Sequence, residues 1–206
     1  MADLEGGGMK KEHPILFSAP MVLAILDGKK TMTRRVCKTQ SIIGIESCHF
    51  SETGFAFTDE NNLCSCVPVK CPYGQVGDRL WVRETWAQDE PQVIYRADYN
   101  GDKPPSGKWK PSIFMPRWAS RITLEITNIR VERLQEITGK DIIKEGAVLR
   151  AHDDDFGHNP LSAFDGKVYL DLVSLWAPGW DKINGKTYPW ASNCWVWVIE
   201  FKMVKP

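Results

Sequence analysis

The most apolar run of the chain lies close to its end, from Trp195 to Phe201 (WVWVIEF). A strand of this composition is too apolar for both of its faces to meet water. It needs a sheet whose surface is covered by other elements. The fold must therefore contain a sheet with at least one packed layer over it.

Three earlier runs have the two-residue alternation of strands. They are Arg79–Glu84, Gln92–Arg96 and Arg121–Thr127, and the last continues through a bend or bulge to Leu134. Glycines and prolines between residues 100 and 116 predict a loop. The chain is therefore expected to be rich in short strands.

Helical signals are short. Residues 20–26 form an apolar run with Ser18 as N-cap and Gly28 as the stop. Thr138 and Asp141 have the spacing of a capping box, which predicts a helix from Asp141 to Gly146 with Glu145 in its last turn. A further helical region is expected to open at Asn159-Pro160.

Together these patterns predict an α+β fold, a small and partly open β-barrel with short helices at its rim. We expect a flexible tail over residues 1–13 and a single domain over residues 14–206, with a hairpin-like insertion at about 40–63. The 206 residues, 43% of them hydrophobic, are enough to form a core.

The charges balance, with 26 Lys and Arg against 26 Asp and Glu. The whole molecule therefore lacks the basic bias of a non-specific DNA-binding protein, so any nucleic-acid contact needs a local patch. The first residues lack the apolar core of a signal peptide, and no segment has the length of a membrane span. We expect a cytoplasmic protein without membrane contact.

Cysteine and histidine raise the question of zinc. Cys48, Cys64, Cys66 and Cys71 lie within 24 positions of one another. Their gaps are irregular, whereas structural zinc sites repeat a gap of two to four residues. We expect no metal and no cofactor, and Cys66 and Cys71 would be the ligands if zinc were bound.

The basic turn from Asp27 to Arg35 (DGKKTMTRR) follows the first helix directly. Its second half favours a strand, on which Thr31, Thr33 and Arg35 share one face. Two interpretations are open from the residues alone. The lysines complement the helix dipole and face water, or they gather around an anionic ligand beside the threonines.

Four segments, in this order, resemble the ASCH domain, a branch of the PUA-like β-barrels: Gly28–Arg34, Gly77–Val82, Asp141–Gly146 and Trp195–Phe201. The segments at 71–75, 81–86 and 115–120 look like a longer version often encoded by bacteriophages and prophages. The resemblance covers about residues 14–203. It implies a PUA-like barrel with insertions at about 40–70 and 97–118.

The resemblance also implies a function. Small bacterial ASCH proteins include an amidohydrolase that removes the acetyl group from acetylated cytidine, with a lysine, a threonine and a distant glutamate as its proposed catalytic set. By motif position these residues are Lys30, Thr33 and Glu145. The expected activity is deacylation of an N-acylated cytidine or a similar modified base.

The rival interpretation is a module that binds RNA, DNA or a modified base without catalysis, and a ribonuclease is a third option. Basic side chains would contact phosphates, and Trp86 or Trp118 would stack on a base. The substrate-binding candidates are Lys29, Thr31, Arg34, Arg35, Arg83, Glu84, Trp86 and Trp118.

Overall fold

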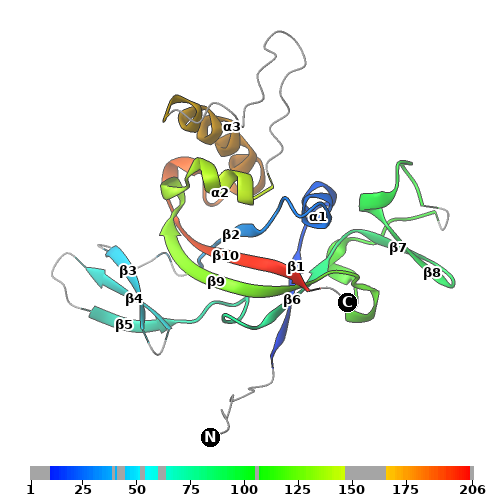
Figure 1. The fold of residues 1–206 in the computed structure, drawn as a ribbon, viewed down its shortest axis with the longest axis horizontal. Coiled ribbons are helices and arrows are strands. Elements are labelled where there is room, and N and C mark those ends of the chain that lie inside the picture. The colour runs from blue at the N-terminus through cyan, green and yellow to red at the C-terminus, as the bar shows by residue number, and fades with distance from the viewer. Residues whose placement is uncertain are drawn as a thin grey trace, which may run out of the picture. The chain divides into compact units, whose positions relative to one another are not determined.

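The computed structural model describes residues 10–38, 40, 45–51, 54–59, 64–104, 107–146 and 166–204. Within them the fold is mixed α and β with few helices (Figure 1). Five strands form the largest sheet of this part of the chain, in the order β1-β6-β9-β10-β2. Their bounds are β1 Glu12–Leu16, β2 Met32–Val36, β6 Arg79–Arg83, β9 Thr123–Arg133 and β10 Trp195–Val204.

The predicted strands are confirmed, with ends that shift by a few residues. The run Gln92–Arg96 forms β8, Gln92–Tyr95, which pairs with β7, Trp86–Asp89. The predicted continuation of the third strand past Thr127 is confirmed, since β9 runs on to Arg133. The predicted tail ends at residue 13, whereas β1 already starts at Glu12. Residues 1–9 of that tail lie outside the described residues.

The predicted insertion is a small antiparallel sheet of its own. It consists of β3 Ile45–Ser51, β4 Gly54–Asp59 and β5 Cys64–Val69, in sequence order. Its side chains are not described, and Cys48, Cys64 and Cys66 are among them. Of the four cysteines, only Cys71 has a described side chain, and it is half-buried. The zinc question therefore falls largely outside the described side chains.

The helices begin and end where the sequence signals lie. α1 is Ala19–Leu26, and the amide of Val22 donates to the carbonyl of Ser18 (2.9 Å). α2 is Gly139–Lys144. α3, Gly166–Asn184, forms the described part of the third helical region, whose expected start at Asn159-Pro160 lies outside the described residues.

The chain divides into two compact units. The first consists of residues 1–23, 71–128 and 201–206, and contains β1, β6, β7 and β8. The second consists of residues 24–70 and 129–200, and contains β2, α2 and α3. The prediction of a single domain stays a prediction.

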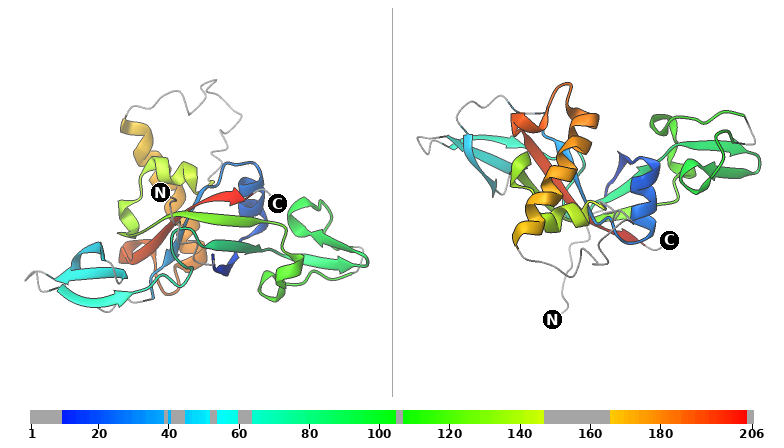
Figure 2. Two further views of the ribbon diagram at one scale, coloured as in Figure 1. Left: turned by 60° about the horizontal axis from the view of Figure 1, so that its bottom comes forward. Right: turned by 90° about the horizontal axis from the view of Figure 1, so that it is seen from above.

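In the second unit, α2 and α3 lie side by side (Figures 1 and 2). Their apolar faces share a core in which Ile142 of α2 and Leu172 of α3 are buried. A neighbouring core joins Trp180 of α3 to Met32 of β2 and Val198 of β10. β10 is buried from Trp195 to Ile199 and at Phe201, which confirms that its apolar run is covered.

Candidate functional site

A tight turn after α1 positions Lys30. Gly28 has φ +71°, a left-handed conformation that favours glycine, and its amide donates to the carbonyl of Ile25 (2.9 Å). The next two amides, of Lys29 and Lys30, both donate to the carbonyl of Ala24 (2.8 Å each). The chain is thereby bent so that Lys30 enters the interior, where its side chain is 0% exposed.

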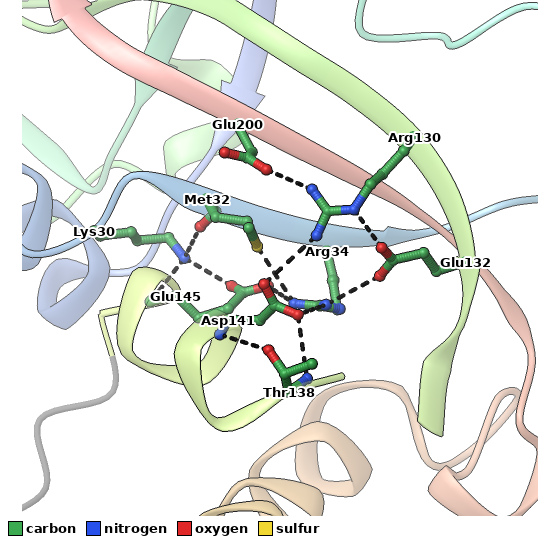
Figure 3. A network of polar contacts seen from close by, with 9 residues as sticks. All are labelled: Lys30, Met32, Arg34, Arg130, Glu132, Thr138, Asp141, Glu145 and Glu200. Atoms are coloured by element: carbon green, nitrogen blue, oxygen red, sulfur yellow. Dashed lines mark hydrogen bonds and ion pairs between the residues drawn. The ribbon is translucent and has the colours of Figure 1, made fainter. Parts of the chain in front are cut away.

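The Lys30 ammonium meets Glu145, 115 positions away along the chain. Its Nζ lies 2.9 Å from Glu145 Oε2 and donates to two main-chain carbonyls, those of Met32 (2.7 Å) and Glu145 (2.8 Å). The backbones of Lys30 and Glu145 also form an isolated antiparallel bridge. Main chain and side chain thus hold the same pair together (Figure 3).

Burial lowers the pKa of Lys30 below its ordinary value. Loss of hydration is the largest cause, and the positive charges of Arg35 and Arg34 act in the same direction. The carboxylate of Glu145 opposes them, since it favours the charged ammonium. The net direction makes Lys30 a readier proton donor than a lysine in water.

Helix α2 carries Glu145 at its C-terminal end. Thr138 and Asp141 form the predicted capping box: Thr138 Oγ1 accepts from the Asp141 amide (3.2 Å), and Asp141 Oδ2 accepts from the Thr138 amide (3.1 Å). Glu145 is the C-cap, and Gly146 follows with φ +78°. A β-carbon on Gly146 would lie 2.8 Å from Cβ of Lys30, so the helix stop also leaves room for the lysine.

Arg34 ties β2 to both ends of α2 (Figure 3). Its side chain is 1% exposed and its Nη2 lies 3.0 Å from Asp141 Oδ2 and 3.2 Å from Glu132 Oε2. Its Nη1 lies 3.5 Å from Glu145 Oε1. Burial tends to raise the pKa of Asp141, but hydrogen bonds from Thr138 and the charge of Arg34 lower it on balance.

One carboxylate oxygen in this network is poorly satisfied. Glu145 Oε1 is buried and accepts no hydrogen bond from the part of the chain that the structure describes. The guanidinium of Arg34 provides charge at 3.5 Å without hydrogen-bonding geometry. An oxygen in this state has lone pairs available for a proton or a ligand donor.

Thr33 is buried in β2, opposite Ile199 of β10. Strand alternation places it on the other sheet face from Met32 and Arg34. Lys30 Nζ is bonded to the carbonyl of Met32, which belongs to the peptide unit that joins Met32 to Thr33. Lys30 Nζ therefore contacts the backbone directly before Thr33, on the last strand in the sheet order.

Three other candidates of the basic turn have different surroundings. Lys29 is exposed and its Nζ lies 2.9 Å from Asp27. Thr31 is exposed, and its amide donates to the carbonyl of Lys144 (2.8 Å). Arg35 is half-buried in β2, opposite Trp197. Of the basic turn, only Lys30 and Arg34 contact Glu145 through described ion pairs.

The remaining candidates belong to the first unit. Arg83 donates to the carbonyls of Met115 (3.0 Å) and Ile113. Glu84 is buried and paired with Arg121 at 2.9 and 3.1 Å; burial is the main cause that raises its pKa, against the opposing charge of Arg121.

The two candidate tryptophans differ in exposure. Trp86 is 3% exposed, whereas Trp118 is 65% exposed and contacts the Trp86 ring edge-on, with 5.8 Å between centroids. Trp86 therefore has little surface to offer a base, and Trp118 has a great deal. Of these two tryptophans, Trp118 is the one with enough exposed surface for a base to stack on it, the role predicted for either residue.

Sequence reasoning missed several charged residues around Arg34. Arg130 and Glu132 of β9 contact each other, and Arg130 also contacts Glu200 of β10 (Figure 3). The signal was opposite charges two positions apart on an alternating strand, where both side chains share one face. Asp141 was interpreted as a cap alone, although the same Oδ2 that accepts from the Thr138 amide also lies 3.0 Å from Arg34 Nη2.

Comparison with known proteins found no match among protein-family models, curated proteins or solved structures. Within the described residues, no group of three or more His, Cys, Asp or Glu side chains is arranged to hold a metal ion. No helix of that same part of the chain is long and apolar enough to cross a membrane.

Proposed function

We propose that Lys30, Thr33 and Glu145 form a hydrolytic site that deacylates an N-acylated cytidine or a similar modified base. In the same proposal the chain is an ASCH-type protein with a partly open PUA-like barrel. The observation that carries it is the buried contact of 2.9 Å between Lys30 Nζ and Glu145 Oε2. A buried ion pair is weak evidence for stability, and perturbed pairs of this kind gather at functional sites.

The hydrogen bonds of Lys30 suggest its role. The carbonyls of Met32 and Glu145 only accept, so two N–H groups of Lys30 stay committed to them in either protonation state. The remaining N–H position faces Glu145 Oε2. The proton that Lys30 can give up is therefore the one it shares with Glu145.

A balanced route follows from this arrangement. The Thr33 hydroxyl attacks the acyl carbon and passes its proton to Glu145, which donates it to the exocyclic nitrogen as the carbon–nitrogen bond breaks. Lys30 holds the Glu145 carboxylate in place across their hydrogen bond and stabilises its charge. Water hydrolyses the acyl-threonine ester by the same proton route, which releases the acid and restores Thr33.

Hydrolysis of N4-acetylcytidine, followed by ultraviolet absorbance, tests the proposal. We expect Lys30→Met, Thr33→Ala and Glu145→Gln each to lower kcat/KM by at least about 100-fold, the scale of general acid–base catalysis. Lys186→Met, which changes an exposed lysine of the same unit, is the matched control and should keep wild-type activity. Circular dichroism verifies the fold of each variant.

Two results would remove the proposal. One is wild-type turnover by Lys30→Met or Thr33→Ala in folded form. The other is absence of turnover by the wild-type protein across a set of cytidines with different acyl groups on the exocyclic nitrogen.

A further inference from the structure

Arg34 is shared by three carboxylates, and it contacts them in two different ways. Its Nη2 donates to Asp141 Oδ2 (3.0 Å) and to Glu132 Oε2 (3.2 Å). Its Nη1 lies 3.5 Å from Glu145 Oε1, where the two groups form an ion pair without a hydrogen bond. A charge-assisted hydrogen bond would bring these atoms to about 2.7–2.9 Å. The guanidinium therefore stops short of Glu145.

The rigid shape of the guanidinium explains why it stops there. Its N–H groups lie in one plane at fixed angles, so a constraint on Nη2 also constrains Nη1. Asp141 belongs to α2 and Glu132 to β9, so two different elements hold Nη2. Arg34 cannot move fully onto Glu145 unless one of these two hydrogen bonds weakens.

Asp141 is itself held in place on both of its oxygens. Oδ2 also accepts from the Thr138 amide (3.1 Å), and Oδ1 lies 3.5 Å from Arg130 Nη2. Burial tends to raise the pKa of Asp141, but the hydrogen bonds from Thr138 and the charge of Arg34 lower it on balance, so the carboxylate stays charged. Both oxygens face donors. An asparagine amide, in either orientation, would therefore turn an N–H group toward another donor.

Asp141 and Glu145 lie one helical turn apart on α2. The amide of Glu145 donates to the carbonyl of Asp141 (2.8 Å), and side chains four positions apart share one face of a helix. The helix thus sets the spacing of the two carboxylates, and the guanidinium of Arg34 lies against both (Figure 3). A change at Asp141 must alter how closely Arg34 approaches Glu145.

We infer that Asp141 is a positioning residue of the Lys30–Glu145 site. Together with Glu132, it holds Arg34 near enough to stabilise the charge of Glu145, yet short of a hydrogen bond to Oε1. The functional consequence rests on the proposed function, in which Glu145 accepts the proton of the nucleophile. A hydrogen bond from Arg34 would occupy the oxygen and favour the charged carboxylate, which weakens a base. Asp141 thereby keeps Oε1 available for the proton.

Crystal structures of the wild type and of Asp141→Asn test the geometry without any substrate. In the variant, Arg34 should move onto Glu145 and shorten the distance between Nη1 and Oε1 from 3.5 Å to about 2.8 Å. Glu132→Gln weakens the other hydrogen bond of Nη2 and should shorten the same distance, which keeps the test decisive if Asp141→Asn does not fold. An unchanged distance in the folded variant would overturn the inference.

Kinetics with N4-acetylcytidine separate positioning from stability. Asp141→Asn should lower kcat about 10-fold, less than the loss of about 100-fold expected for the catalytic residues, and should leave KM near its wild-type value. Asp141→Glu keeps the charge and suits a capping box, so it should restore most of the lost kcat. Thr138→Ala removes the acceptor of the Asp141 amide but not the contact between Asp141 and Arg34. This control should lower the urea midpoint and keep the wild-type kcat.

Two kinetic outcomes would overturn the positioning role. One is an equal loss of kcat in Thr138→Ala and Asp141→Asn at similar urea midpoints, since Asp141 would then act through stability alone. The other is a wild-type kcat in Asp141→Asn. If the wild type deacylates none of the acylated cytidines, the proposed function fails, whereas the distance between Arg34 and Glu145 still decides whether Asp141 positions the guanidinium.

Discussion

Gly146→Ala is expected to disturb the candidate site through a steric contact that Gly28→Ala lacks. Both glycines have positive φ, +78° and +71°. An added β-carbon at 146 would lie 2.8 Å from Cβ of Lys30 and 2.9 Å from Cβ of Ala24, whereas at 28 nothing lies within 4 Å. A comparison of the two variants therefore separates the cost of backbone strain from the cost of steric crowding.

The magnitudes follow from these two contributions. The left-handed conformation costs an alanine about 1–2 kcal/mol at either position. Crowding of a packed interior adds about 1–3 kcal/mol at position 146 alone. We therefore expect Gly28→Ala to lower the free energy of unfolding by about 1–2 kcal/mol and Gly146→Ala by about 2–5 kcal/mol. The displaced lysine should also reduce deacylation more than the Gly28 variant does.

Urea unfolding followed by circular dichroism measures both variants. With an m-value of about 2 kcal/mol/M, the expected difference of 1–3 kcal/mol separates their midpoints by about 0.5–1.5 M. Equal midpoints for the two variants would refute the reasoning, because crowding against Lys30 and Ala24 is the contribution that distinguishes them.

Two further predictions concern the charges of the site. Because folding lowers the pKa of Lys30, the unfolded chain binds more protons at this residue than the folded chain does. The free energy of unfolding of the wild type, relative to that of Lys30→Met, should therefore rise with pH from the lowered pKa up to about 10.4. Urea midpoints measured over a series of pH values test this. Arg34→Met should lower the free energy of unfolding by about 3–5 kcal/mol, because it leaves Asp141 and Glu145 without the buried cation between them. In the same urea assay, a loss below about 1 kcal/mol would contradict the structural role of Arg34.

Local patterns predicted much of the fold. The glycine stop at Gly28, the capping box at Thr138 and the apolar run of β10 act within a few residues, so the sequence alone identifies them. The order of the strands in the sheet is set by contacts between distant segments, and no local pattern reports it.

Some features of the candidate site likewise follow from local sequence, and others depend on contacts between distant segments. A carboxylate at the C-terminal end of a helix opposes the helix dipole and is stabilised by a nearby cation, which Lys30 provides for Glu145. The burial of Arg34 was missed, because an arginine beside threonines has the same local pattern on an exposed edge as under a helix. Only the position of α2 over β2 distinguishes the two, and the carboxylates that satisfy Arg34 come from β9 and α2.

The bridge between Lys30 and Glu145 also bears on how the chain varies in length. The two residues close a loop of 115 positions through their own backbones. The entropy of closing a long loop grows only with the logarithm of its length, by about 0.6 kcal/mol for each doubling. Segments between the two residues, such as β3–β5, can therefore lengthen or shorten at small thermodynamic cost while the geometry of the pair is preserved.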